Sequence, residues 1–375
     1  MKFLDQDTNN QIQNINNRVT LGIFTKCHST LENARLARFA MQNQAAKLLP
    51  KERVKSCLKC RISINENVGV KYNTKRDKAH YSNLQRCGSV WHCPVCASNI
   101  TEKRKQEIKK ATDAHTGGVY MLTLTIPHYF GDNLKMLILG LELAVKRFFG
   151  GRKSKSIWEK IGKIGHIRAL EVTHGRNGWH PHFHFLIFTE NHLPDDFDTT
   201  DLLDIWKNAC RLAKLPIPNH HGLDFKKGNY SAYVAKWGIE NEIAKGHTKT
   251  GKNGNLTAWD FLKLSMLDDE QAGKLFQEFA ITFKGRRQLV WSRGLKAMFG
   301  VVEKTDEQLA DETEKTSKNV LDLERALWAL IVRYKSRAYF LELVEKDYRT
   351  GTNCAFEFLE ELAIIEYKRL LIDDT

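Results

Sequence analysis

The chain has 375 residues, and its 42% hydrophobic and 27% charged composition is that of a soluble globular protein with a sizeable core. The longest apolar stretches, at 137–143 and 183–188, are far too short to span a bilayer. Residues 1–17 have neither a basic start nor an apolar core, so we expect no secretion signal, no membrane partner and a cytoplasmic location. The net charge of +14 instead favours a polyanionic partner.

The hydrophobic pattern changes period along the chain and predicts helices and strands in turn. An amphipathic helix is expected at 29–49, before Pro50, and a charged helix at 101–114. Strands are expected at 119–126, 166–173 and 180–188, with a glycine-containing loop between the last two. The other expected elements are helices at 134–149, 201–215 and 230–243, a short strand at 224–225, helices around a strand at 288–291, and acidic helices after 305.

The positive charge is distributed unevenly along the chain. Residues 301–375 hold 11 Lys and Arg against 17 Asp and Glu, so the other 300 residues hold 47 against 27. The densest positive segment is 146–168, where eight basic residues accompany the single acid Glu159. A solvated surface is the plainer explanation, but so many like charges repel one another unless something negative covers them, which favours DNA. The residues expected to bind DNA are Lys146, Arg147, Arg152, Lys153 and Lys155.

Five of the eight cysteines cluster between positions 57 and 96 and contain two CxxC pairs. Two such pairs are typical of a structural Zn²⁺ site with four tetrahedral thiolates. Such a module could contact DNA or serve only as a structural staple. The expected ligands are Cys57, Cys60, Cys93 and Cys96, with Cys87 or His92 as a substitute for one of them.

Three histidines, His180, His182 and His184, stand at alternate positions of one expected strand. Alternate side chains of a strand share one face, so two of these imidazoles can bind one metal ion and leave coordination positions open. Glu171 is the single acid of the neighbouring expected strand and is the candidate third ligand. Two imidazoles and a carboxylate suit Mn²⁺ or Mg²⁺ with room for phosphate oxygens.

Tyr233 and Lys236 lie three residues apart on an expected helix and therefore share a face. A phenol with a pKa of about 10 is a poor nucleophile at neutral pH. It becomes effective where a metal polarises the phosphate and a cation stabilises the developing charge. Alone, such a pair more often contributes to core packing. The presence of the histidine strand in the same chain is what favours a catalytic role for the two residues.

Three motifs of this chain occur in the order found in plasmid rolling-circle replication initiators. They are Thr123 to Thr125, the histidine segment 178–188, and Tyr233 to Lys236. Residues 279–295 also look like the C-terminal segment of these proteins. Over roughly 55–300, the chain resembles this family, which belongs to the superfamily of His-hydrophobe-His (HUH) endonucleases.

The resemblance implies a metal-dependent nickase that also rejoins DNA. His182 and His184 would bind the metal, and Tyr233 would attack a DNA phosphate to form a 5′-phosphotyrosine link and a free 3′-hydroxyl. Lys236 would position or neutralise the phosphate. Some members carry an acid four residues before the tyrosine to end the cycle, but Asn229 stands here and cannot act as a base.

The expected fold is α+β, with a central antiparallel sheet that carries the histidine strand and is flanked by helices. His180 is expected to support the site or contact substrate. The expected partner is plasmid origin DNA, as duplex and as extruded single strand, and host helicase and polymerase are further candidates. The expected domains are 1–50 (N-terminal tail and helix), 51–114 (zinc-binding module), 115–300 (nickase domain) and 301–375 (acidic helical C-terminal region).

Other functions share some of these features. A histidine-triad nucleotide hydrolase would explain the histidine strand but not Tyr233, the cysteines or the charge. A zinc-knuckle DNA-binding regulator without catalysis would explain the charge and the cysteines but not the histidines. A relaxase or a single-strand transposase would share the chemistry and differ in its biological role.

Overall fold

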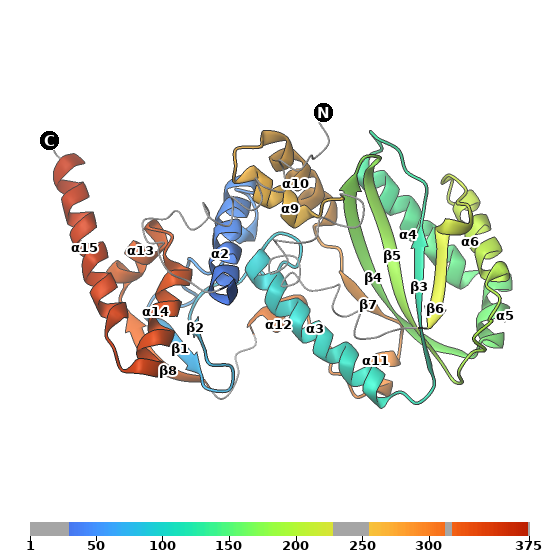
Figure 1. The fold of residues 1–375 in the computed structure, drawn as a ribbon, viewed down its shortest axis with the longest axis horizontal. Coiled ribbons are helices and arrows are strands. Elements are labelled where there is room, and N and C mark those ends of the chain that lie inside the picture. The colour runs from blue at the N-terminus through green and yellow to red at the C-terminus, as the bar shows by residue number, and fades with distance from the viewer. Residues whose placement is uncertain (1–29, 228–254, 312–316, 374–375) are drawn as a thin grey trace. The chain divides into compact units, whose positions relative to one another are not determined.

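The computed structural model describes residues 30–227, 255–311 and 317–373, with helices and strands in two compact units (Figure 1). The sheet unit contains the described residues of 101–304. The cysteine unit contains residues 30–100 together with the described residues from 305 onward, a region that we expected to stand apart. No helix in the described parts of the chain has both the length and the apolar character needed to cross a membrane.

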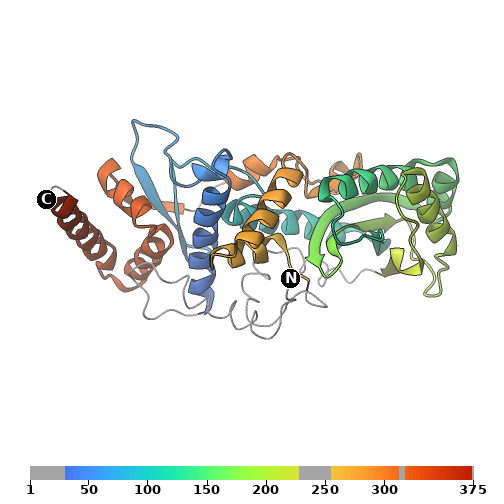
Figure 2. The same cartoon turned by 90° about the horizontal axis from the view of Figure 1, so that it is seen from above.

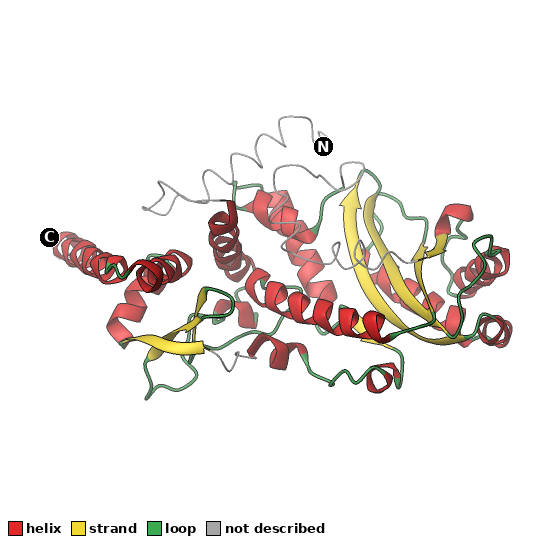
Figure 3. Ribbon diagram, turned by 60° about the horizontal axis from the view of Figure 1, so that its bottom comes forward, coloured by secondary structure: helices red, strands yellow, loops and turns green. Residues whose placement is uncertain are grey.

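The sheet unit is built on a five-stranded antiparallel sheet in the order β6-β3-β5-β4-β7 (Figure 3). The histidine strand β5 is the central strand, as predicted. Its neighbour β4 joins it through a tight hairpin in which Gly175 pairs with Gly178. The strands are β3 (Gly118–Thr125), β4 (Lys163–Gly175), β5 (Gly178–Thr189), β6 (Leu223–Lys227) and β7 (Leu289–Trp291).

Apolar side chains of β5 cover both faces of the sheet. Phe183 and Phe185 point to one face, where Phe149 at the end of α4 lies 5.0 Å from the Phe185 ring. Leu186 and Phe188 point to the other face, into a cluster with residues of α3 and α11. The histidines share this second face and lie beyond the cluster along the strand. The helices of this unit are α4 (Leu134–Gly150), α5 (Arg152–Lys160), α6 (Thr200–Leu212), η2 (His220–Gly222), α9 (Ala258–Ser265), α10 (Glu270–Phe283) and α11 (Leu295–Met298), with most of α3 (Pro94–Ala114).

The cysteine unit contains a three-stranded antiparallel sheet in the order β2-β1-β8 (Figure 2). Its strand β8 corrects the helix expected after 305, because residues 317–323 pair with β1 from Val68 to Asn73. Leu321 and Leu323 have the two-residue spacing of a strand, and the pairing satisfies the backbone of β1 on the side away from β2. The elements are α2 (Thr30–Leu48), η1 (Arg53–Lys55), β1 (Val68–Asn73), β2 (Lys78–Tyr81), α12 (Asp306–Asp311), β8 (Ser317–Leu323), α13 (Arg325–Arg333), α14 (Arg337–Thr350) and α15 (Cys354–Asp373).

Two buried charged side chains of α14 connect the C-terminal helices to the rest of this unit. Glu345 accepts a hydrogen bond from the backbone of Ala79 at 2.7 Å and pairs with Arg35 at 2.6 Å. Arg337 is 1% exposed and donates to the carbonyl of Leu58 at 2.7 Å. Burying such groups is costly unless they are hydrogen-bonded, so these contacts specify where α14 docks.

Candidate metal centre and nucleic-acid interface

The strand register brings Glu171 and two histidines to the same place. Glu171 of β4 stands directly opposite His182 of β5, and His184 is the next residue on the same face. One carboxylate oxygen of Glu171 lies 3.2 Å from His184 Nε2 and 3.6 Å from His182 Nε2. The candidate ligand atoms of the three residues all lie within 4.8 Å of one another.

Hydrogen bonds on the far side of each ring fix how the two imidazoles are oriented. His184 Nδ1 lies 2.9 Å from the hydroxyl of Thr123, the residue that pairs with His184 on the neighbouring strand β3. His182 Nδ1 donates to the backbone carbonyl of His180 at 3.2 Å. Both Nε2 atoms are therefore turned toward Glu171. Metal-binding histidines commonly show this arrangement, in which the second ring nitrogen is held by a hydrogen bond.

The electrostatics of this group favour an ionised carboxylate. Burial acts to raise the pKa of Glu171, but the charges and hydrogen bonds of His182 and His184 outweigh it and hold the pKa well below its usual value. The Glu171 side chain is still 42% exposed, whereas each imidazole is 12% exposed. Two imidazoles and one accessible carboxylate fit a divalent ion with open coordination positions.

His180 does not belong to this group. Its Nε2 lies 2.6 Å from the hydroxyl of Thr125, and its ring stacks on His128 with centroids 4.5 Å apart. Burial, together with the neighbouring His182 and His128, lowers the pKa of His180 to about 3, so the ring is neutral. His180 therefore forms a wall beside the candidate metal ligands.

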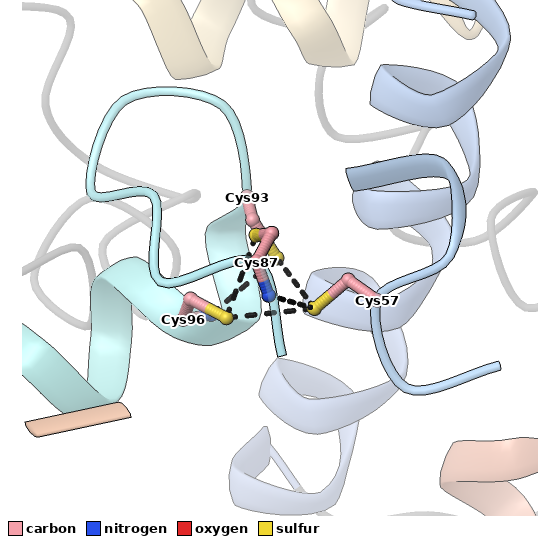
Figure 4. A group of neighbouring side chains, drawn as sticks. All are labelled: Cys57, Cys87, Cys93 and Cys96. Atoms are coloured by element: carbon pink, nitrogen blue, oxygen red, sulfur yellow. Dashed lines mark hydrogen bonds between the residues drawn. The ribbon is translucent and has the colours of Figure 1, made fainter. Parts of the chain in front are cut away.

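Four buried cysteines converge in the cysteine unit (Figure 4). The sulfur of Cys57 lies 3.8 Å from that of Cys93 and 3.5 Å from that of Cys96, and Cys87 lies 3.6 Å from Cys96. A tetrahedron with Zn–S bonds of about 2.3 Å has edges of about 3.8 Å, so these thiols fit zinc without rearrangement. Cys60 is exposed and lies outside the group, so the structure places the substitute Cys87 where we first expected Cys60.

Hydrogen bonds support the sulfur atoms as they would support thiolates. The backbone N–H of Cys87 donates to the sulfur of Cys57 at 3.4 Å, and the side-chain amide of Gln42 donates to Cys93 at 3.2 Å. Burial acts to raise the pKa of Cys93, but hydrogen bonds from the neighbouring thiols hold it well below its usual value. His92 lies outside the four-thiol group, with Nδ1 4.0 Å from Glu52.

The five basic residues expected to bind DNA are exposed on α4 and α5. Four of them line an open pocket of about 670 Å³ between α4, α5 and α6. Lys153 has an acidic neighbour, Asp201, at 3.8 Å. Helix α4 lies against one face of the sheet (Figure 1), and Phe149 at its end contacts Phe185 there. Because side chains alternate along β5, the histidines lie on the opposite face from this basic surface.

Tyr233, Lys236 and Asn229 lie outside the described residues, so their placement relative to the histidines stays a prediction. Among the described residues, sequence reasoning missed the roles of Thr125, His128 and Gln42. Thr123 and Thr125 belong to the first family motif, and their alternation on the strand beside the histidines is the signal that could have suggested hydrogen bonds to imidazoles.

The fold and this site define an α+β protein with a carboxylate and two imidazoles on its central sheet. A model of the replication protein family matches residues 79–340, more than half of the chain, and the chain belongs to this family. This result confirms the resemblance to plasmid rolling-circle replication initiators. No solved structure matches the chain.

Two curated relatives with the name "Protein rep" agree with this assignment. The chain is 29% identical over 293 residues to the "Protein rep" of Streptomyces lividans, covering 58% of this chain and 64% of that protein. It is 28% identical over 138 residues to the "Protein rep" of Lentilactobacillus hilgardii, covering 34% and 42%. It is also 33% identical over 132 residues to a "Neomycin resistance protein" of Streptomyces cyanogenus, covering 28% and 30%. The matches thus span less than two thirds of each relative's length.

Proposed function

We propose that this protein initiates rolling-circle replication of a plasmid by nicking one strand of its origin DNA. The observation that supports this most strongly is the meeting of Glu171, His182 and His184 on the central sheet of a replication-family protein. Three protein donors leave open positions on a divalent ion, where phosphate oxygens can bind. Mg²⁺ or Mn²⁺ is the proposed ion.

Tyr233 is the proposed nucleophile, assisted by Lys236. When bound, the divalent ion would polarise the scissile phosphate and so offset the high pKa of a phenol. The tyrosine oxygen bonds to phosphorus as its proton leaves, the bond from phosphorus to the 3′ oxygen breaks, and that oxygen takes up a proton as a primer hydroxyl. The phosphotyrosine keeps the energy of the phosphodiester, so attack by a 3′-hydroxyl rejoins the strand.

The four-thiol group is the proposed site of a structural Zn²⁺, with Cys57, Cys87, Cys93 and Cys96 as ligands. The basic residues of α4 and α5 are proposed to bind the backbone of the origin duplex. Because they lie on the opposite face of the sheet from the histidines, they would hold a different stretch of DNA from the strand that is nicked. Host helicase and polymerase are proposed to act on the nicked product.

The test uses supercoiled plasmid that carries the protein's own origin, incubated with Mn²⁺ or Mg²⁺. We expect relaxed circles with covalently attached protein, and we expect a chelator to prevent their formation. Tyr233→Phe should abolish the product, while the neighbouring Tyr230→Phe serves as the matched control and should retain it. Nicking by Tyr233→Phe at the wild-type rate would show that the nucleophile is misassigned.

A further inference from the structure

A polar pocket lies beside the candidate metal ligands, on the same face of β5. It has a volume of about 330 Å³ and adjoins the histidine row, since the rings of His180 and His182 are 5.0 Å apart. A volume near ten times the roughly 30 Å³ share of one water suits one nucleotide rather than a duplex. Its lining consists of His128, Gly175, Arg176, Asn177, His180 and Asn255.

The chemistry of this lining selects for a planar polar ligand with a negative backbone. His128 and His180 form a flat stacked wall, with 17° between their planes. Arg176 is exposed, and the described residues give it no acidic partner. Asn and Arg side chains are the groups that most often hydrogen-bond to the edges of purine bases. Among the residues that the structure describes, the pocket lining contains one cationic side chain, Arg176, and no carboxylate.

The β4–β5 hairpin holds Asn255, one of the residues that line the pocket, in place. The backbones of His174 and Leu256 exchange two hydrogen bonds, of 2.8 and 2.7 Å, and thereby fix Asn255 beside the hairpin. The Asn255 side chain occupies the space that a Cβ at position 175 would take, because a Cβ added at Gly175 would lie 1.9 Å from its side-chain oxygen. The pocket is therefore built by tertiary contacts and does not depend on surface charge alone.

Two exposed aromatic residues continue the surface beyond the pocket. Tyr129 and Phe130 follow His128 directly and are 63% and 68% exposed. Their backbone packs on the other end of the hairpin, where a Cβ added at Gly178 would lie 3.3 Å from the Tyr129 carbonyl. Exposed aromatic rings beside a cationic groove are the usual platform for unpaired bases.

We propose that this pocket and the two aromatic residues bind unpaired bases of the single strand next to the scissile phosphate. Arg176 and Asn255 contact the edge of the first base, and Tyr129 and Phe130 stack on the next. This inference rests on the proposed nicking function and deepens it, because it names the residues that recognise the bases of the DNA substrate.

The test measures binding without cleavage. Tyr233→Phe protein is titrated with a fluorescent single-stranded oligonucleotide from its own origin, carrying one abasic position at a time, and anisotropy gives the affinity. We expect an abasic nucleotide beside the nick position to weaken binding about tenfold. Adding Arg176→Ala or Asn255→Ala should weaken binding to the intact strand and remove this sensitivity. Arg211→Ala, which removes an exposed arginine on α6, should leave the tenfold effect intact.

A second pair of variants guards against misfolding at the hairpin. Phe130→Ala removes an exposed ring and should weaken binding several-fold, whereas Phe356→Ala removes an exposed ring on α15 and should not. If no abasic position near the nick is coupled to Arg176 or Asn255, the base-binding pocket is refuted even when wild-type protein nicks normally. If coupling is found but wild-type protein forms no covalent nick, the proposed function fails and the pocket stands.

Discussion

Replacing Cys87 and Cys60 in turn separates the four-thiol site of the structure from the two CxxC pairs of the sequence. Cys87 is buried with its sulfur 3.6 Å from Cys96, whereas Cys60 is exposed and outside the group. Structural zinc sites contribute about 10–16 kcal/mol of apparent binding free energy. An even division among four thiolates gives roughly 2.5–4 kcal/mol for each, so Cys87→Ala should lower zinc affinity on the order of 10²- to 10³-fold.

The assay is the zinc content of dialysed protein by mass spectrometry, followed by competition with a coloured chelator. Wild-type and Cys60→Ala proteins should each keep one zinc per chain and release it at the same chelator concentration. Cys87→Ala should lose the metal to dialysis or to far less chelator. Retention of zinc by both variants would refute the assignment of Cys87 as a ligand, and equal loss from both would refute the choice of Cys87 over Cys60.

Three other substitutions, and Thr125→Val as a control, test the hydrogen bonds and buried charges. Thr123→Val should weaken Mn²⁺ binding about 10- to 100-fold, because it removes the hydroxyl that is hydrogen-bonded to His184 Nδ1. Thr125→Val removes a hydroxyl that contacts His180 instead and should leave the Mn²⁺ affinity unchanged. Electron paramagnetic resonance of Mn²⁺ measures both affinities. Burial and two neighbouring cations lower the pKa of His166 to about 3 in the folded chain. In the unfolded chain the pKa of a histidine is about 6.5, so below this pH the unfolded chain binds a proton that the folded chain does not. Stability therefore falls as the pH falls, and His166→Phe should reduce the loss between pH 8 and pH 5 by about 2 kcal/mol in urea unfolding. Arg337→Met should lower the unfolding free energy of the cysteine unit by about 3 kcal/mol or more in a denaturant titration, because its guanidinium donates to buried acceptors.

Each of these expectations has a clear contrary result. Equal Mn²⁺ affinities for the two threonine variants would show that the Thr123 hydroxyl does not orient a ligand. An unchanged pH dependence in His166→Phe would show that this imidazole titrates normally in the folded chain. Wild-type stability of Arg337→Met would mean that the docking of α14 rests on its apolar contacts instead.

The central sheet and the candidate metal ligands could be predicted because their signals are local. Alternation at 180, 182 and 184 sets the face of the strand, and the short loop before it makes β4 the antiparallel neighbour. The position of Glu171 can then be predicted without contacts between distant segments, since a tight hairpin fixes which residue stands opposite His182.

Contacts between distant segments could not be predicted in the same way. By their spacing alone, the two CxxC pairs already provide the four ligands of a zinc site. Only the tertiary structure shows that Cys87 rather than Cys60 lies beside the other three thiols. Strand β8 lies almost 250 residues after its partner β1, and its leucines also fit a helical pattern. The Asn255 wall of the pocket likewise depends on a bridge between His174 and Leu256.

Mapping the covalent adduct tests most directly the central claim that Tyr233 attacks DNA at the site of Glu171, His182 and His184. Wild-type protein is incubated with Mn²⁺ and a single-stranded oligonucleotide from its own origin, then digested with nuclease and trypsin. Fragmentation of peptide 228–236, which also contains Tyr230, should locate a nucleotide 5′-phosphate on Tyr233, and the double variant His182→Ala, His184→Ala should give no adduct. A nucleotide on Tyr230 or on a histidine, or cleavage without any adduct, would contradict the account.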